Sequence, residues 1–157
     1  MKLYHSSNTS IEQPDTLHSR KYLDFGCGFY LTSIYDQAVR YAQRFKRRGN
    51  EAWLNTYELN LADEAQWIIK KFGSYDQEWL DLVAQCRDGK DSCNYDMVVG
   101  GIANDKVILT LDRYFMGELS QEEALGLLKF EKPNIQYCIR SEKMLRSCLV
   151  FIGSEKI

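Results

Sequence analysis

The sequence has little proline, little histidine and no closely paired cysteines, and each shortage excludes a class of protein. Its 157 residues include 2 prolines and 2 histidines, so neither a disordered chain nor a histidine-rich metal site is expected. Five cysteines form no CxxC pair (Cys27, Cys86, Cys93, Cys138, Cys148), which argues against a zinc ribbon or a disulfide-stapled secreted domain. With no signal-peptide pattern and no apolar run of about 18 residues, we expect a reduced, cytoplasmic protein with no metal and no membrane partner.

The sequence also lacks an excess of either charge. Basic residues number 20 and acidic residues 22, which gives a formal net charge of −2, so the total charge does not indicate a nucleic-acid or membrane surface. Hydrophobic residues make up 45% of the chain, as expected for one domain over residues 1–157. Basic residues are concentrated only between Arg40 and Arg48, where a predicted helix ends and positive charge suits the helix dipole.

Hydrophobic periodicity predicts strands at both ends of the chain and helices in the middle. Strands are expected over residues 2–5, 29–32, 52–61, 67–69, 95–99, 135–139 and 149–152, and helices over 36–48, 75–87, 105–116, from 120 and from 141. Ser33 or Asp36 is a candidate cap for the first helix, and Ser120 with Glu123 forms a capping box. This order predicts an α+β fold rather than a regular βαβ array.

Several common catalytic motifs are absent. The Gly26-Cys27-Gly28 segment lacks the third glycine of a dinucleotide fingerprint, because position 31 is leucine. The sequence contains no phosphate loop, HExxH or GxSxG motif. No cysteine has a neighbourhood that would mark it as an activated nucleophile.

Three separated segments carry a more specific pattern when they are read together. The first is Leu3-Tyr4-His5-Ser6-Ser7, and the second is the segment from Phe25 to Thr32, followed by Tyr41 eleven residues after Tyr30. The third is Asn134-Ile135-Gln136-Tyr137-Cys138. This order resembles the ADP-ribosyltransferase superfamily, particularly its histidine–tyrosine–glutamate branch. The whole chain is also similar to a small bacterial family of uncharacterised domains placed in that superfamily.

The resemblance implies an ADP-ribosyltransferase-like split β-sheet with peripheral helices, NAD⁺ as co-substrate, and a role for each matching residue. His5 would bind a ribose hydroxyl, and backbone groups at Ser6 would bind the nicotinamide carboxamide. Tyr30 and Tyr41 would stack on the nicotinamide ring. The glycines Gly26 and Gly28, in the segment that ends at Thr32, would let the backbone approach NAD⁺. Each residue also has an ordinary structural interpretation, as a core aromatic, a turn glycine or a hydrogen-bonded histidine.

Two residues depart from the family pattern. Ser6 stands where the pattern has glycine, and Gln136 stands where the active enzymes place glutamate. Glutamine can bind a ribose hydroxyl but cannot ionise, so it offers no general base and no charge to a cationic transition state. On the acceptor side, Glu131 could supply the missing carboxylate, and Asn134 could orient the acceptor.

These features leave three functions open. The first is an NAD⁺-dependent ADP-ribosyltransferase or NAD⁺ glycohydrolase, with His5, Tyr30 and Gln136 as catalytic residues. It would act on a protein or nucleic acid, as a toxin with a neutralising partner protein or as a defence effector. The second is a non-catalytic module of the same fold that binds NAD⁺, ADP-ribose or a protein. The third is a nucleic-acid-binding protein that uses the basic residues between Arg40 and Arg48.

Overall fold

The strands form one mixed sheet. The computed structural model describes residues 1–91 and 93–157, and in these residues seven strands lie in the order β4-β5-β6-β2-β1-β3-β7. Their bounds are β1 (Lys2–Ser7), β2 (Phe29–Thr32), β3 (Trp53–Leu59), β4 (Ile69–Lys71), β5 (Met97–Gly101), β6 (Ile135–Ile139) and β7 (Leu149–Lys156). Only β4 and β5 are parallel, and the other neighbouring strands are antiparallel.

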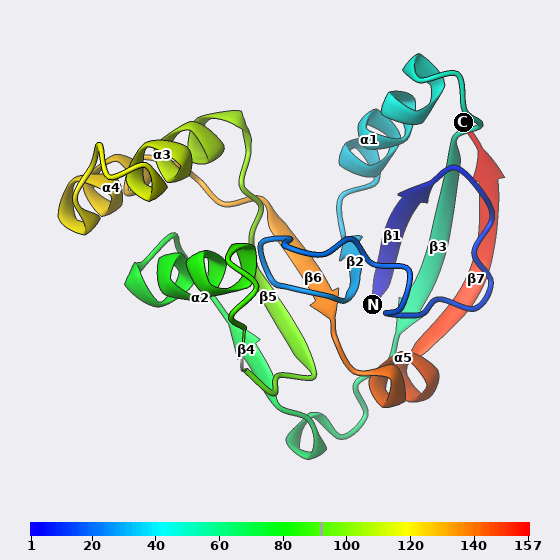
Figure 1. The fold of residues 1–157 in the computed structure, drawn as a ribbon. Coiled ribbons are helices and arrows are strands. Elements are labelled where there is room, and N and C mark those ends of the chain that lie inside the picture. Colours follow the sequence, from blue (N-terminus) through cyan, green and yellow to red (C-terminus); the bar gives the residue numbers. More distant parts are fainter. Residues whose placement is uncertain (92) are drawn as a thin grey trace.

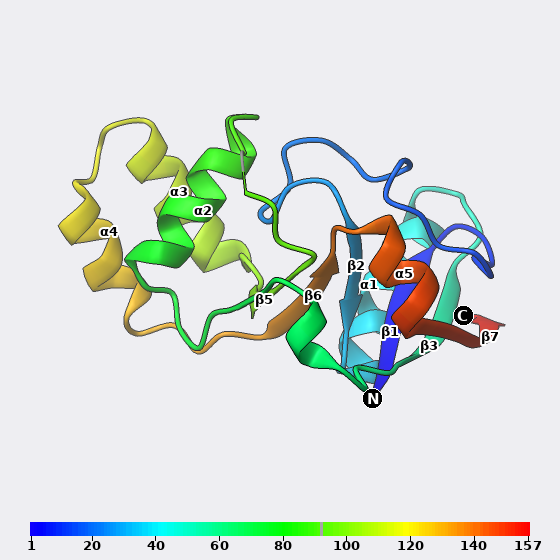
Figure 2. The same ribbon diagram turned by 90° about the horizontal axis from the view of Figure 1, so that it is seen from below.

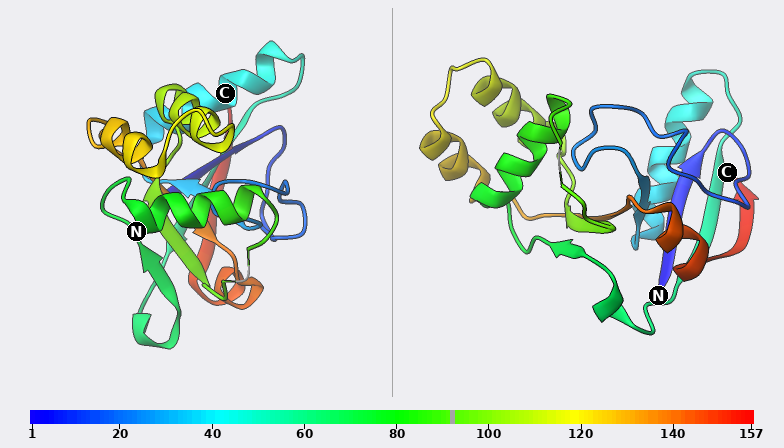
Figure 3. Two further views of the ribbon diagram at one scale, coloured as in Figure 1. Left: turned by 60° about the vertical axis from the view of Figure 1, so that its left-hand side comes forward. Right: turned by 60° about the horizontal axis from the view of Figure 1, so that its bottom comes forward.

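The sheet is divided between β1 and β2. These two strands share one register pair, Tyr4 with Thr32, whereas β1 pairs with β3 at six positions and β2 pairs with β6 at four. The strands therefore form two half-sheets, β4-β5-β6-β2 and β1-β3-β7, which diverge in Figure 1 and in the right panel of Figure 3. The predicted α+β fold with a split sheet is confirmed.

Helices cover both faces of this divided sheet. Their bounds are α1 (Tyr35–Arg47), α2 (Gln77–Arg87), α3 (Asp105–Phe115), α4 (Gln121–Leu128) and α5 (Glu142–Cys148). Alternate strand residues point to opposite faces, so Cys138 joins the core beneath α2, α3 and α4, while Ile139 joins the core beside α5. Helices α2–α4 gather at one end of the molecule, and α1 and α5 lie at the other (Figures 1 and 2).

Most elements lie where the periodicity predicts them, and two local predictions are wrong. Neither Ser33 nor Asp36 caps α1, because the N-cap is Ile34 and has no side-chain cap bond. The backbone N–H of Ile34 instead donates to Thr32 Oγ1 at 3.2 Å. The strand expected over 67–69 begins at Ile69, because Trp67 follows a short 3-10 turn and is buried in the core beside α5.

Candidate functional site

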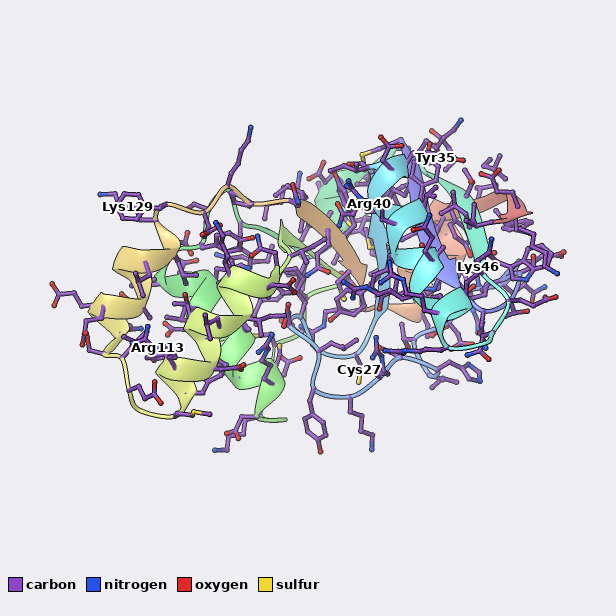
Figure 4. The ribbon with its side chains drawn as sticks, turned by 90° about the horizontal axis from the view of Figure 1, so that it is seen from above. Cys27, Tyr35, Arg40, Lys46, Arg113 and Lys129 are labelled. Carbon is purple, nitrogen blue, oxygen red and sulfur yellow. The ribbon has the colours of Figure 1, made fainter. Side chains whose placement is uncertain are left out.

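A large cavity lies where the sheet divides. It has a volume of about 1200 Å³, with residues of α1 on one side and of the start of α3 on the other. Seen from above in Figure 4, α1 and α3 flank an interval with β2 and β6 between them. Tyr30, Thr32 and Gln136 contribute to the cavity from these two strands, on the same sheet face as the buried Cys138. The cavity thus occupies the part of this face that lies between the α2–α4 group and α1.

Most of the residues singled out from the sequence line this one cavity. They come from β1, β2, α1 and the start of β6: His5, Ser6, Gly28, Tyr30, Thr32, Tyr41, Asn134 and Gln136. Gly26 and Glu131 do not line it. The three separated sequence segments therefore meet at one place in the fold.

His5 bridges the two half-sheets at the point where backbone pairing stops. Its Nδ1 lies 2.7 Å from the carbonyl oxygen of Tyr30, and its ring stacks on Phe29 at a centroid distance of 4.3 Å. A carbonyl oxygen can only accept, so Nδ1 carries the proton and Nε2 is left with a lone pair. Burial lowers the pKa of His5 below its usual 6.5, with the bond to Tyr30 opposing part of that effect. The ring is therefore neutral at pH 7 and presents an acceptor at Nε2.

Tyr30 is held in a fixed orientation by the preceding turn. Its hydroxyl donates to the carbonyl of Gly26 at 2.6 Å and accepts from the backbone N–H of Phe25 at 3.1 Å. Gly26 has a φ of +74°, a left-handed conformation that favours glycine. Burial raises the pKa of the Tyr30 hydroxyl above its usual 10.0, so it stays protonated. Gly26 does not itself line the cavity, and it forms the turn that holds Tyr30.

Gly28 lines the cavity and packs closely against β6. A Cβ at this position would lie 2.5 Å from Sγ of Cys138 and 2.8 Å from the carbonyl oxygen of Ile139. The missing side chain therefore permits close approach to β6. Gly28 shapes the cavity wall by letting the chain pass directly over that strand.

Ser6 leaves an open strand edge beside the cavity. Its hydroxyl donates to the carbonyl of Ala38 in α1 at 2.6 Å, so the side chain is engaged with the helix. On the β2 side of β1, no residue after Tyr4 has a register partner among the residues that the structure describes. The backbone N–H and C=O groups of β1 beyond Tyr4 on this side therefore have no strand partner in the described chain. A carboxamide could form hydrogen bonds with such free backbone groups.

Tyr41 lies on the α1 wall and is partly open to solvent. Its hydroxyl accepts from Arg20 Nη2 at 3.2 Å, its ring meets Phe45 edge-on at 6.1 Å, and the guanidinium of Arg44 lies 4.9 Å from the ring centroid. Within the described residues, the rings of Tyr30 and Tyr41 make no direct aromatic contact. Both tyrosines line the same cavity, so a flat ring bound between them would occupy the cavity.

Gln136 and its neighbours form the end of the cavity nearest α3. Gln136 lies opposite Thr32 and Gly100 in the sheet, and within the described residues its side chain makes no hydrogen bond. The carbonyl of Asn134 accepts from the N–H of Ile102 at 2.8 Å, which ties the start of β6 to the segment leading into α3. The amide of Gln136 is therefore available to a ligand.

Asp105, and not Glu131, is a carboxylate that lines the cavity. Glu131 lies outside the cavity. Burial raises the pKa of the Tyr75 hydroxyl, and the charge of Glu131 adds to that rise, so Glu131 lies on the Tyr75 side. Asp105, in the first turn of α3, lines the cavity instead. Of the cavity's carboxylates, Asp15 pairs with His18 and Asp24 with Arg87, whereas Asp105 has no cationic partner within 4.0 Å in the described chain.

The comparisons with known proteins give a family but no activity. Fold and site together define an α+β protein with a divided sheet and a large cavity at the division. The chain belongs to the family described as "Protein of unknown function (DUF3990)", whose model matches residues 1–151. No curated protein and no solved structure matches the chain.

None of the helices in residues 1–91 and 93–157 is both long enough and apolar enough to cross a bilayer. In the same residues, no group of three or more His, Cys, Asp or Glu side chains is placed to hold a metal ion.

Proposed function

We propose that this protein binds NAD⁺ in the cavity at the sheet division and transfers its ADP-ribose to a macromolecule or to water. The observation that carries the proposal is the meeting of His5, Tyr30 and Gln136 in one cavity. These residues are separated by 25 and 106 positions in the sequence, and the family resemblance gives each of the three positions a role at NAD⁺, with Gln136 standing in place of the family's glutamate.

The residues at the division can orient the two ends of NAD⁺. Nε2 of neutral His5 would accept a hydrogen bond from a ribose hydroxyl, since Nδ1 is held by the Tyr30 carbonyl. Free backbone groups of β1 near Ser6 would bind the nicotinamide carboxamide. Tyr30, whose hydroxyl is fixed by the 25–26 turn, would present its ring to the nicotinamide, with Tyr41 on the other side.

Cleavage breaks the glycosidic bond between the ribose C1″ and the nicotinamide nitrogen, and the electron pair leaves with nicotinamide. The sugar becomes cationic, so rigid positioning and nearby negative charge favour the reaction. Gln136 would hold a ribose hydroxyl through its free amide. We assign the negative charge to Asp105, in place of Glu131, because Asp105 lines the cavity and has no cationic partner among the described residues.

Two tyrosines on the same helix provide a matched test of this proposal. Tyr41 lines the cavity, whereas Tyr35 is exposed to a similar extent, 43% against 38%, and does not line it; Figure 4 labels Tyr35 at the beginning of α1. Stacked aromatic rings contribute about 0.5–1.5 kcal/mol beyond area burial. Tyr41→Ala should therefore weaken NAD⁺ binding by roughly 2- to 13-fold in calorimetry.

Tyr35→Ala is the control and should bind NAD⁺ like the wild type. Absence of NAD⁺ binding to the folded wild type would refute the proposal. Equal weakening by the two substitutions would place the nicotinamide outside the cavity. Binding without nicotinamide release, with or without a cell lysate as acceptor, would favour the non-catalytic module over the enzyme.

A further inference from the structure

The α1 wall of the cavity is strongly positive. Four arginines that line the cavity have no carboxylate within 4.0 Å in the described part of the chain: Arg20, Arg40, Arg44 and Arg47. The cavity's fifth arginine, Arg87, is neutralised by Asp24 at 2.7 Å. The positive charge of this wall is therefore free to act on a ligand.

Three of these arginines form a row along one side of the helix. Arg40, Arg44 and Arg47 are four and three residues apart, so they share a helix face and extend over roughly 10 Å of its length. Lys46 belongs to the same last turn but does not line the cavity. In Figure 4, Arg40 lies on the side of α1 toward α3, and Lys46 lies on the other side. The dipole of α1 explains basic residues in its last turn, but it does not explain why the row faces the cavity.

Aromatic rings accompany the arginine row. Arg44 lies over the ring of Tyr41, Arg20 donates to the Tyr41 hydroxyl, and Phe45 follows Tyr41 on the cavity side. Proteins that bind single-stranded nucleic acids combine a positive groove for the backbone with aromatic side chains on which bases stack. An acidic protein segment would use the charges but would gain little from the rings.

The cavity is also large and rich in free positive charge. Ligand pockets usually measure about 300–1,000 Å³, and this one measures about 1200 Å³. NAD⁺ has two phosphate groups, which is fewer than the four free arginines. The arginines in excess of these two phosphates fit a second ligand with several phosphates.

We infer that the arginine row of α1 binds a single-stranded nucleic acid and that this strand is the acceptor of ADP-ribose. The acceptor role rests on the proposed function, whereas the binding does not. In the transfer, the bond from C1″ to nicotinamide breaks and the electron pair leaves with nicotinamide. A nitrogen or oxygen of the strand forms the new bond to C1″, and the proton that it carried is released to solvent.

Binding is tested with fluorescein-labelled single-stranded RNA and DNA of mixed sequence, by anisotropy over a range of salt concentrations and without NAD⁺. Arg44→Ala/Arg47→Ala should weaken binding by tenfold or more. Each phosphate contact to a single strand contributes about 0.7 to the slope of log K against log salt, so this variant should reduce the slope by about 1.4. Lys46→Ala/Arg48→Ala removes the same charge from the same helix end and should change the affinity by less than about threefold.

Several results would overturn the inference. One is that the folded wild type does not bind the oligonucleotide. Another is that the two double variants weaken oligonucleotide binding equally, and a third is that polyglutamate competes as strongly as unlabelled oligonucleotide of equal charge. Transfer is tested with NAD⁺ labelled in the adenine half. Label on the oligonucleotide supports the acceptor role, and label only on lysate proteins overturns it. Nicotinamide release is measured without oligonucleotide in parallel, so a failure of the proposed function is recognised separately.

Discussion

Gly28→Ala tests how the cavity wall is built. A Cβ at this position would lie 2.5 Å from Sγ of Cys138, which is fully buried, and 2.8 Å from the backbone carbonyl of Ile139. The carbonyl oxygen cannot give way unless β6 moves, because it belongs to the backbone of the strand that pairs with β2, and the buried Sγ can rotate away only into a packed core. Overpacking of this kind costs about 1–3 kcal/mol, which corresponds to a fall in Tm of roughly 2–12 °C for a chain of this size.

The assay is thermal unfolding followed by circular dichroism, with Gly126→Ala as the control. A Cβ at Gly126 meets nothing within 4 Å, and the residue lies inside α4, so this substitution should stabilise the protein by about 0.5–1 kcal/mol. Gly28→Ala with the stability of the wild type would refute the packing argument. If that variant were also unable to bind NAD⁺, Gly28 would return to the role expected from the sequence, close approach to the ligand.

Three further predictions concern groups around the site. Burial lowers the pKa of His5 below 6.5, so the stability that the neutral ring contributes is complete above about pH 6.5 and declines as the pH falls toward the folded-state pKa. Between about pH 6.5 and 5, the Tm of His5→Gln should therefore fall less than the Tm of the wild type. Asp91→Ala should cost about 3–5 kcal/mol in denaturant unfolding, because it leaves the buried guanidinium of Arg140, 12% exposed, without its carboxylate; no loss of stability would contradict this buried pairing. Tyr30→Phe removes the hydroxyl bonded to Gly26 and Phe25 and should lower the free energy of unfolding by about 1–3 kcal/mol, while the NAD⁺ affinity of the folded variant stays within a few-fold of the wild type. Loss of NAD⁺ binding without loss of stability would show that the hydroxyl itself contacts the ligand.

The elements that were predictable from the sequence are those with strong local signals. The apolar spacing of α1, the capping box of α4 and the alternation in β3 depend on neighbouring residues, and all three elements form where expected. Caps and short strands proved less predictable. Ile34 is the N-cap of α1, and its N–H donates to Thr32 Oγ1 two positions earlier. Trp67 is a core residue rather than a strand residue, an outcome that depends on tertiary packing.

Part of the candidate site was also predictable from the sequence, and part depends on the fold. Motif order was enough to predict that His5, Tyr30 and Gln136 share a cavity. It could not indicate that Asp105 rather than Glu131 lines this cavity, because the path of the chain between α4 and β6 decides it. The basic cluster was visible in the sequence, but only the fold shows that Arg40, Arg44 and Arg47 face the cavity while Lys46 does not.

Nicotinamide release by Gln136 variants tests the central claim most directly, because this amide is free and lies in the cavity with His5 and Tyr30. Loss of a positioned hydrogen bond to a reacting group commonly costs about 10²–10³ in rate. Gln136→Ala should therefore reduce release by that factor while NAD⁺ binding stays within several-fold, and Gln136→Glu should preserve or raise it. Gln43→Ala, on α1 outside the cavity, should release nicotinamide like the wild type. Release by folded Gln136→Ala at the wild-type rate would contradict the account.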